Sequence, residues 1–187
     1  MKRTTLLLGL MLTLSIASAQ SPTNPPPAAK LSGHVRYEIQ PLQMGAPYAG
    51  QEANEKAKAK IQEHLNAEIG PLLETWNQAA AASGESQTTL VLFPEIQSIK
   101  FISGGKRVWT GAFSGSSYVY LKVTLREQPT GTVIGEPQFY QRASALSGAW
   151  TFGAQDNDML RRVVTLVSNY MSMNYGEPVG GPTGYEP

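Results

Sequence analysis

Few residues in this sequence have the chemistry that catalysis requires. Nucleophilic catalysis needs a hydroxyl or thiol group with a base within reach, but the chain has no cysteine and only two histidines, His34 and His64. A catalytic triad would have to combine one of them with distant serines and with Asp156 or Asp158, and no nucleophile-elbow spacing supports that arrangement. We therefore expect no catalytic residues and a protein that is not an enzyme.

The residues that could hold metals or cofactors are equally sparse. Two histidines without cysteine do not make a structural zinc site. The stretch from Asp156 to Asp158 lacks the rest of a calcium loop, so we interpret it as the start of a helix. The glycines at 104–105 and 111–115 do not match a phosphate-binding motif. The sequence thus predicts no metal and no cofactor.

Cations, aromatic rings and glycines lie together in one stretch, and this is the best candidate for a binding site. Lys106 and Arg107 precede Trp109, and Phe113 follows between glycines. Recognition loops combine these residue types, since aromatic and arginine side chains dominate binding energy. A hairpin loop without a binding role is the alternative interpretation of the same stretch.

The elements that must position this stretch are strands. Residues 118–127 alternate strictly, which is the pattern of a half-buried strand. Val119, Leu121, Val123 and Leu125 fall on one face, and Tyr118, Tyr120, Lys122, Thr124 and Arg126 fall on the other. The turn at 128–131 then predicts a second strand, over 132–145, that folds back beside the first. If one face of the sheet stays open, Tyr118 and Tyr120 can form a flat surface for a partner.

Two more strands and two helices complete the expected core. Alternation predicts strands over 33–42 and 88–102, the second with a bulge between Pro94 and Ile99 where the apolar parity changes. Apolar residues at steps of three and four predict helices over 51–82 and from Asp156 onward. The Gly70–Pro71 pair inside the first predicts either a kinked helix or two helices end to end.

The two ends of the chain carry different signals. Residues 1–19 match a secretory signal peptide, with Lys2 and Arg3 before an apolar run and Ala17-Ser18-Ala19 at its end. A Pro-rich linker is expected over 20–30 and a disordered Gly/Pro-rich tail over 176–187. Without the two leading cations the net charge is near −1, which gives no electrostatic basis for binding nucleic acid. The mature chain has no expected transmembrane segment.

Residues 89–145 contain a succession of motifs that resembles a widespread group of exported bacterial envelope proteins of unknown function. The motifs are Leu90-x-Leu92-x-Pro94-Glu95-Ile96, Lys106-Arg107-x-Trp109-x-Gly111, Gly115-Ser116-Ser117 and Thr130-Gly131-x-Val133-Ile134. The fold of this group is similar to the periplasmic α/β domain of curli-secretion-type and transport-auxiliary lipoproteins. The resemblance implies a sheet with helices against it and a role in envelope assembly. This chain lacks the lipid-bearing cysteine of the lipoproteins.

These inferences predict a single α+β domain over residues 31–175. Its antiparallel sheet follows the order β-α-β-β-β-α, and two amphipathic helices cover one face. We expect a non-enzymatic, exported envelope protein, soluble in the periplasm or outside the cell, that binds another envelope protein or assembles with itself. The alternative is a periplasmic carrier of a small molecule or lipid, which needs an apolar cavity between helices and sheet.

Overall fold

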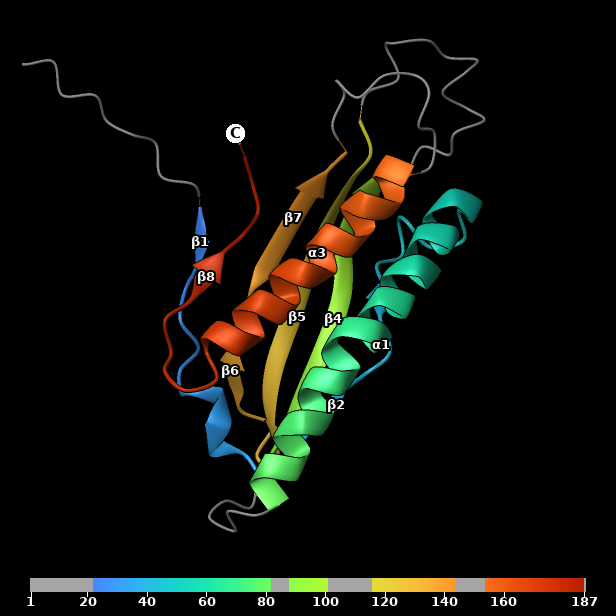
Figure 1. Ribbon diagram of the computed structural model, residues 1–187. Coiled ribbons are helices and arrows are strands. Elements are labelled where there is room, and N and C mark those ends of the chain that lie inside the picture. Colours follow the sequence, from blue (N-terminus) through green and yellow to red (C-terminus); the bar gives the residue numbers. More distant parts are fainter. Residues whose placement is uncertain (1–21, 82–87, 101–115, 144–153, 187) are drawn as a thin grey trace, which may run out of the picture.

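The computed structural model describes residues 22–81, 88–100, 116–143 and 154–186, and the expected signal peptide lies outside these ranges (Figure 1). The described residues form an α+β fold with two long helices and a six-stranded, mostly antiparallel sheet. The sheet contains β2 (Arg36–Ile39), β3 (Gln43–Met44), β4 (Thr89–Lys100), β5 (Tyr118–Gln128), β6 (Val133–Gly135) and β7 (Gln138–Arg142). The helices are α1 (Glu52–Ala81) and α3 (Ala154–Met173), preceded by a short 3-10 turn, η1 (Leu31–Gly33).

The hairpin that follows β5 confirms the predicted turn. Glu127 and Thr132 pair through their backbones across it, and Gly131 adopts a φ of 76°, which favours glycine. The returning chain forms two short strands in place of one, because Glu136 and Pro137 separate β6 from β7. β6 and β7 both run antiparallel to β5, with Tyr120 opposite Tyr140.

β4 lies beside β5 along almost their whole lengths and has the predicted bulge. Leu92 faces Leu125 and Ile96 faces Leu121, and the register then shifts between Ile96 and Ser98. The extra residue moves the following side chains to the other parity, so that Ile99 also points into the core.

The other neighbour of β4 differs from the expected antiparallel sheet. β2 and β3 run parallel to β4, with Tyr37 opposite Leu90. The chain between β3 and β4 passes through α1, and such a helical crossover returns the chain to the same end of the sheet, as parallel pairing requires. The sheet therefore begins with one strand–helix–strand unit and continues as antiparallel hairpins.

Both predicted helices form, and both lie on the same side of the sheet (Figure 1). α1 continues through Pro71 as one helix, which excludes two separate helices. Its buried apolar residues are Ala57, Ile61, Leu65, Ile69, Leu73, Trp76 and Ala80. Those of α3 are Met159, Leu160, Val163, Val164, Val167, Tyr170 and Met171. These side chains pack with Val119, Leu121, Val123 and Leu125 in one core.

The two ends of the described chain differ from the expected linker and disordered tail. β1 (Thr23–Asn24) and β8 (Gly181–Pro182) pair antiparallel in a second, two-stranded sheet. The side chain of Asn174 is fully buried, donates to the carbonyls of Tyr170 and Gly180, and accepts from the amides of Val179 and Gly180. Four hydrogen bonds of the Asn174 side chain thus help to hold the segment between α3 and β8.

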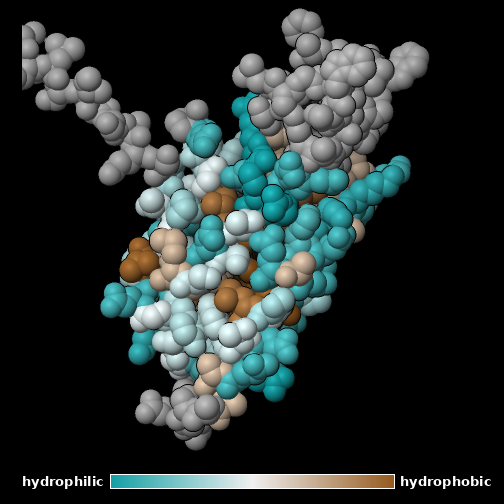
Figure 2. Space-filling model, viewed as in Figure 1, coloured by the Kyte–Doolittle hydropathy of each residue, from teal (hydrophilic) through white to brown (hydrophobic). Residues whose placement is uncertain are grey.

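No helix in the described part of the chain is long and apolar enough to span a lipid bilayer. The side of the molecule that carries α1 and α3 is largely hydrophilic, and apolar residues reach its surface only in small separate patches (Figure 2). The opposite side of the sheet is therefore the better candidate for a broad binding surface.

Candidate binding face

The side of the sheet that faces away from the helices carries a mixed aromatic and charged surface, which we call the helix-free face. It comprises Phe93, Glu95, Ser98 and Lys100 of β4, Tyr118, Tyr120, Lys122, Thr124 and Arg126 of β5, and Gln138, Tyr140 and Arg142 of β7. These positions alternate with the core residues along each strand, so the strict period of two places them together. All of them except Thr124 are partly or largely exposed.

Tyrosines from different parts of the chain meet across this face. The rings of Tyr118 and Tyr140 stack with centroids 6.2 Å apart, and Tyr185 from the C-terminal segment packs on Tyr140 at 5.3 Å. On the other side of Tyr118, its hydroxyl and that of Tyr48 each lie within hydrogen-bond distance of the Ser98 hydroxyl. We call these four tyrosines the tyrosine row. The hydroxyl of Tyr120 donates to the side-chain carbonyl of Gln138 beside it.

The charged groups of the face are distributed unevenly along the strands. Lys122 forms an ion pair of 3.2 Å with Glu136, and the hydrogen bond from Lys122, followed by its charge, lowers the pKa of the Glu136 carboxyl. The guanidinium of Arg126 lies 5.4 Å from the centroid of the Phe93 ring, a cation–π distance. At the far end, Lys100 and Arg142 both stand opposite Tyr118, one on each neighbouring strand.

At both edges of the sheet, backbone groups are hydrogen-bonded to a side chain or to the C-terminal segment. At the β2 edge, the side-chain amide of Asn77 on α1 accepts from the Tyr37 amide and donates to the Tyr37 carbonyl. At the β7 edge, the Tyr140 amide donates to the carbonyl of Thr183. Edge strands with occupied backbone groups resist the addition of a further strand. The face is therefore more available than the edges for binding.

The binding residues predicted from the sequence divide into two groups. Lys106, Arg107, Trp109 and Phe113 lie outside the described residues. Tyr118 and Tyr120 lie on the helix-free face and are half-buried. Sequence reasoning missed the remaining tyrosines of the row. Tyr140 could have been found by extending the hairpin register from Gly131, whereas nothing local in the sequence places Tyr48 or Tyr185 there.

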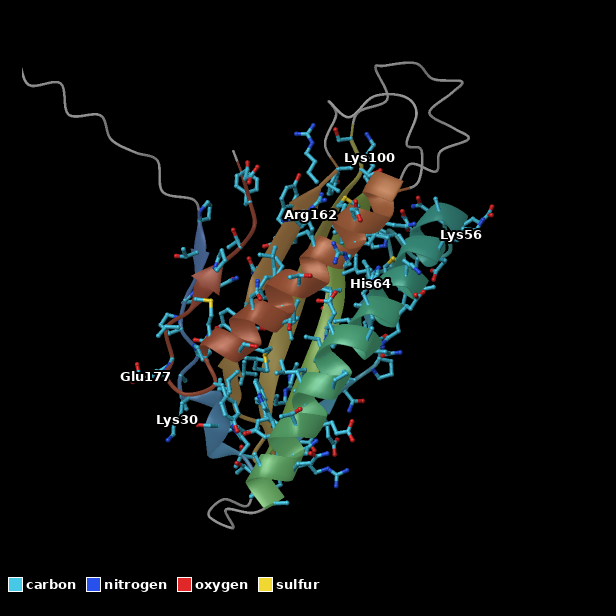
Figure 3. All side chains as sticks on the ribbon, viewed as in Figure 1. Lys30, Lys56, His64, Lys100, Arg162 and Glu177 are labelled. Carbon is cyan, nitrogen blue, oxygen red and sulfur yellow. The ribbon has the colours of Figure 1, made fainter. Side chains whose placement is uncertain are left out.

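The two histidines have different surroundings. His34 is buried, and its ring nitrogens contact the Leu31 carbonyl at 2.9 Å and a carboxylate oxygen of Glu127 at 3.0 Å. His64 projects from α1 (Figure 3), and its Nε2 atom is buried without a hydrogen-bond partner. Within the described ranges, no three histidine, aspartate or glutamate side chains are grouped so that they could hold a metal ion.

Comparison of the sequence with protein-family models and with curated proteins finds no match. Among solved structures, the chain is similar to a PelC dodecamer from Paraburkholderia phytofirmans, with 16% identity and a TM-score of 0.37 over 76% of this chain and 92% of that one. It is also similar to a putative neuraminyllactose-binding hemagglutinin homolog from Helicobacter pylori, with 10% identity and a TM-score of 0.40 over 87% and 96% of the two chains.

Proposed function

We propose that this protein is a non-enzymatic, exported envelope protein whose helix-free face binds another protein or a second copy of the chain. The observation that carries the proposal is the tyrosine row, in which Tyr118 and Tyr140 are half-buried and stacked beside the exposed cations Lys100 and Arg142. Tyrosine and arginine are enriched at protein interfaces because they combine a large apolar area with a polar group.

The packing between helices and sheet favours a surface site over the carriage of a ligand inside. Leu121 and Phe139 on the sheet and Val163 on α3 are completely buried in the same core. A carrier would need an apolar cavity of several hundred Å³ in this layer. We therefore propose binding on the outer face of the sheet.

The proposed location rests on the N-terminal sequence. Residues 1–19 have the charged, apolar and small-residue segments of an export signal, and the chain has no cysteine to carry a lipid anchor. We propose that the mature protein acts in the periplasm or outside the cell, and that its partner is an envelope protein or another copy of itself.

A photo-crosslinking experiment in intact cells tests the face. The full-length protein carries p-benzoylphenylalanine in place of Tyr120, which lies in the centre of the face, or in place of Gln78, which is exposed on α1 and serves as the matched control. We expect a covalent protein adduct from position 120 and none from position 78. An adduct of twice the monomer mass identifies self-association. Adducts from both positions, or from neither, would contradict the proposal.

The segment 106–113 provides a separate prediction. It belongs to the connection between Lys100 and Tyr118, which lie opposite each other in β4 and β5. The connection therefore starts and ends at the end of the face that carries Lys100 and Arg142. Deleting residues 106–113 should abolish partner capture from position 120 and change the melting temperature little. Capture that persists after the deletion would show that these residues do not contribute to the site.

A further inference from the structure

We infer that the partner presents an acidic protein segment to one end of the helix-free face; this inference rests on the function proposed above. The end in question is the row formed by Lys100, Tyr118 and Arg142, which lie opposite one another on β4, β5 and β7. We call these three residues the cationic row. Both of its charged side chains are exposed, and Tyr118 is half-buried between them.

The acidic groups of the face lie away from the cationic row, so the charge of the face changes along the strands. The next residues along the strands are Tyr120 and Tyr140, and Glu95 faces Lys122 only beyond them. Glu136 likewise bonds to Lys122, so the acidic groups described on this face lie on the far side of the tyrosines from the cationic row. Carboxylates of a partner are therefore attracted most strongly to the end that holds Lys100 and Arg142.

A third cation lies close to this end. Arg162 of α3 donates to the backbone carbonyl of Arg142 at 3.3 Å and to the side chain of Gln141 at 2.9 Å, so its guanidinium is held beside the end of β7. Figure 3 shows Lys100 and Arg162 at the same end of the molecule. Positively charged side chains from β4, β7 and α3 thus lie at this end of the sheet.

The side chains of the cationic row favour an acidic protein segment. A guanidinium such as that of Arg142 can bind a carboxylate through two parallel hydrogen bonds. The stacked rings of Tyr118 and Tyr140 offer adjacent area for side chains next to the acidic residues. Because Asn77 and Thr183 occupy backbone groups at the edges, the segment lies on the face and does not extend the sheet as a strand.

Binding of a fluorescein-labelled oligoglutamate peptide to the full mature chain tests this inference by fluorescence anisotropy. The variant K100Q/R142Q should bind about tenfold more weakly, since each of the two exposed ion pairs that it removes contributes about threefold to the affinity. The matched control K56Q/K58Q removes the same charge from α1 and should leave the affinity unchanged within about twofold. Tyr140→Ser should weaken binding as well, and added salt should weaken it further for the wild-type chain.

Three results would overturn the inference. The first is that the wild-type chain fails to bind oligoglutamate at low salt. The second is that both double variants weaken binding equally. The third is that the chain binds alginate and not the peptide, which would assign an acidic glycan as the partner. The crosslinking experiment separates this failure from that of the proposed function. If the K100Q/R142Q chain still yields the adduct from position 120, the face binds a protein and only the acidic character of that partner is wrong.

Discussion

His34 is a buried histidine whose two ring nitrogens both contact oxygen atoms, those of the Leu31 carbonyl and the Glu127 carboxylate. It ties the segment before β2 to the end of β5, which is a structural role. Glu127→Ala should lower the free energy of unfolding by about 1–3 kcal/mol, because it leaves a buried nitrogen without its partner. Urea denaturation measures the change. Glu177→Ala, at an exposed position that points away from the body (Figure 3), should change stability by less than about 0.5 kcal/mol.

Gly184 holds the C-terminal segment against the sheet in a conformation that favours glycine. Its φ is 74°, and an added Cβ would lie 2.7 Å from the Tyr140 carbonyl oxygen and nearer still to the Leu166 side chain. Gly184→Ala should therefore displace this segment and remove Tyr185 from Tyr140, so that limited proteolysis cleaves the C-terminus faster. Gly176→Ala is the control, since a Cβ there meets no atom within 4 Å. Equal cleavage of the two variants would disprove this role for Gly184.

At the scale of elements, Asn77 shows how a helix can protect the edge of a sheet. Its side chain forms hydrogen bonds with both the backbone amide and the backbone carbonyl of Tyr37, which lies 40 residues earlier in the sequence. Asn77→Ala should expose this part of the β2 edge, reducing stability by about 1 kcal/mol and increasing self-association. Size-exclusion chromatography over a range of concentrations detects the association. Gln78→Ala, the exposed neighbour, should remain like the wild-type chain, and an Asn77→Ala chain that also does so would contradict the proposed protection.

The elements that could be predicted from the sequence are those whose signal is local. The alternation along β5, the turn at Gly131 and the change of parity after Pro94 each involve neighbouring residues, and the structure confirms all three. The direction of β2 is not local, because alternation is the same in parallel and antiparallel strands. β1 and β8 have two residues each, too few for a periodic signal, and Asn174 holds the loop before β8 through hydrogen bonds.

The candidate face shows the same division between local and long-range information. Tyr118 and Tyr120 could be assigned to one side of β5 from the sequence because their parity opposes that of Leu121. The tyrosine row also requires a bulge that places Ser98 next to Tyr120, and a C-terminal segment that brings Tyr185 onto Tyr140. These are tertiary contacts, and no pattern within a single segment encodes them.

At the scale of the whole molecule, buried tyrosine hydroxyls join the N-terminal segment to the core. Tyr37 donates to the Leu31 carbonyl at 2.8 Å, and Tyr170 of α3 donates to the Pro25 carbonyl at 2.9 Å. Both rings also make aromatic contacts, Tyr37 with Trp76 and Tyr170 with Phe139. The segment before β2 is therefore fastened to the helix layer and belongs to the folded domain.

The burial of these two tyrosines makes the stability of the fold depend on pH in the alkaline range. Burial raises the pKa of Tyr37 to about 12, with a further contribution from the neighbouring Tyr175, and burial alone raises the pKa of Tyr170 to about 12. In the unfolded chain a tyrosine titrates near its ordinary value of 10.0. Below pH 10 both states are neutral, and between pH 10 and 12 the unfolded state releases its protons first, so stability should fall across that window.

Urea denaturation at a series of pH values from 8 to about 12 measures this loss, which we expect to set in near pH 10. Tyr170→Phe removes one of the two groups and with it the hydrogen bond to Pro25. This variant should be less stable than the wild-type chain at pH 8, but it should lose less stability between pH 10 and 12. Parallel pH profiles for the two chains would mean that the alkaline loss arises elsewhere and that ionisation of Tyr170 does not oppose the fold.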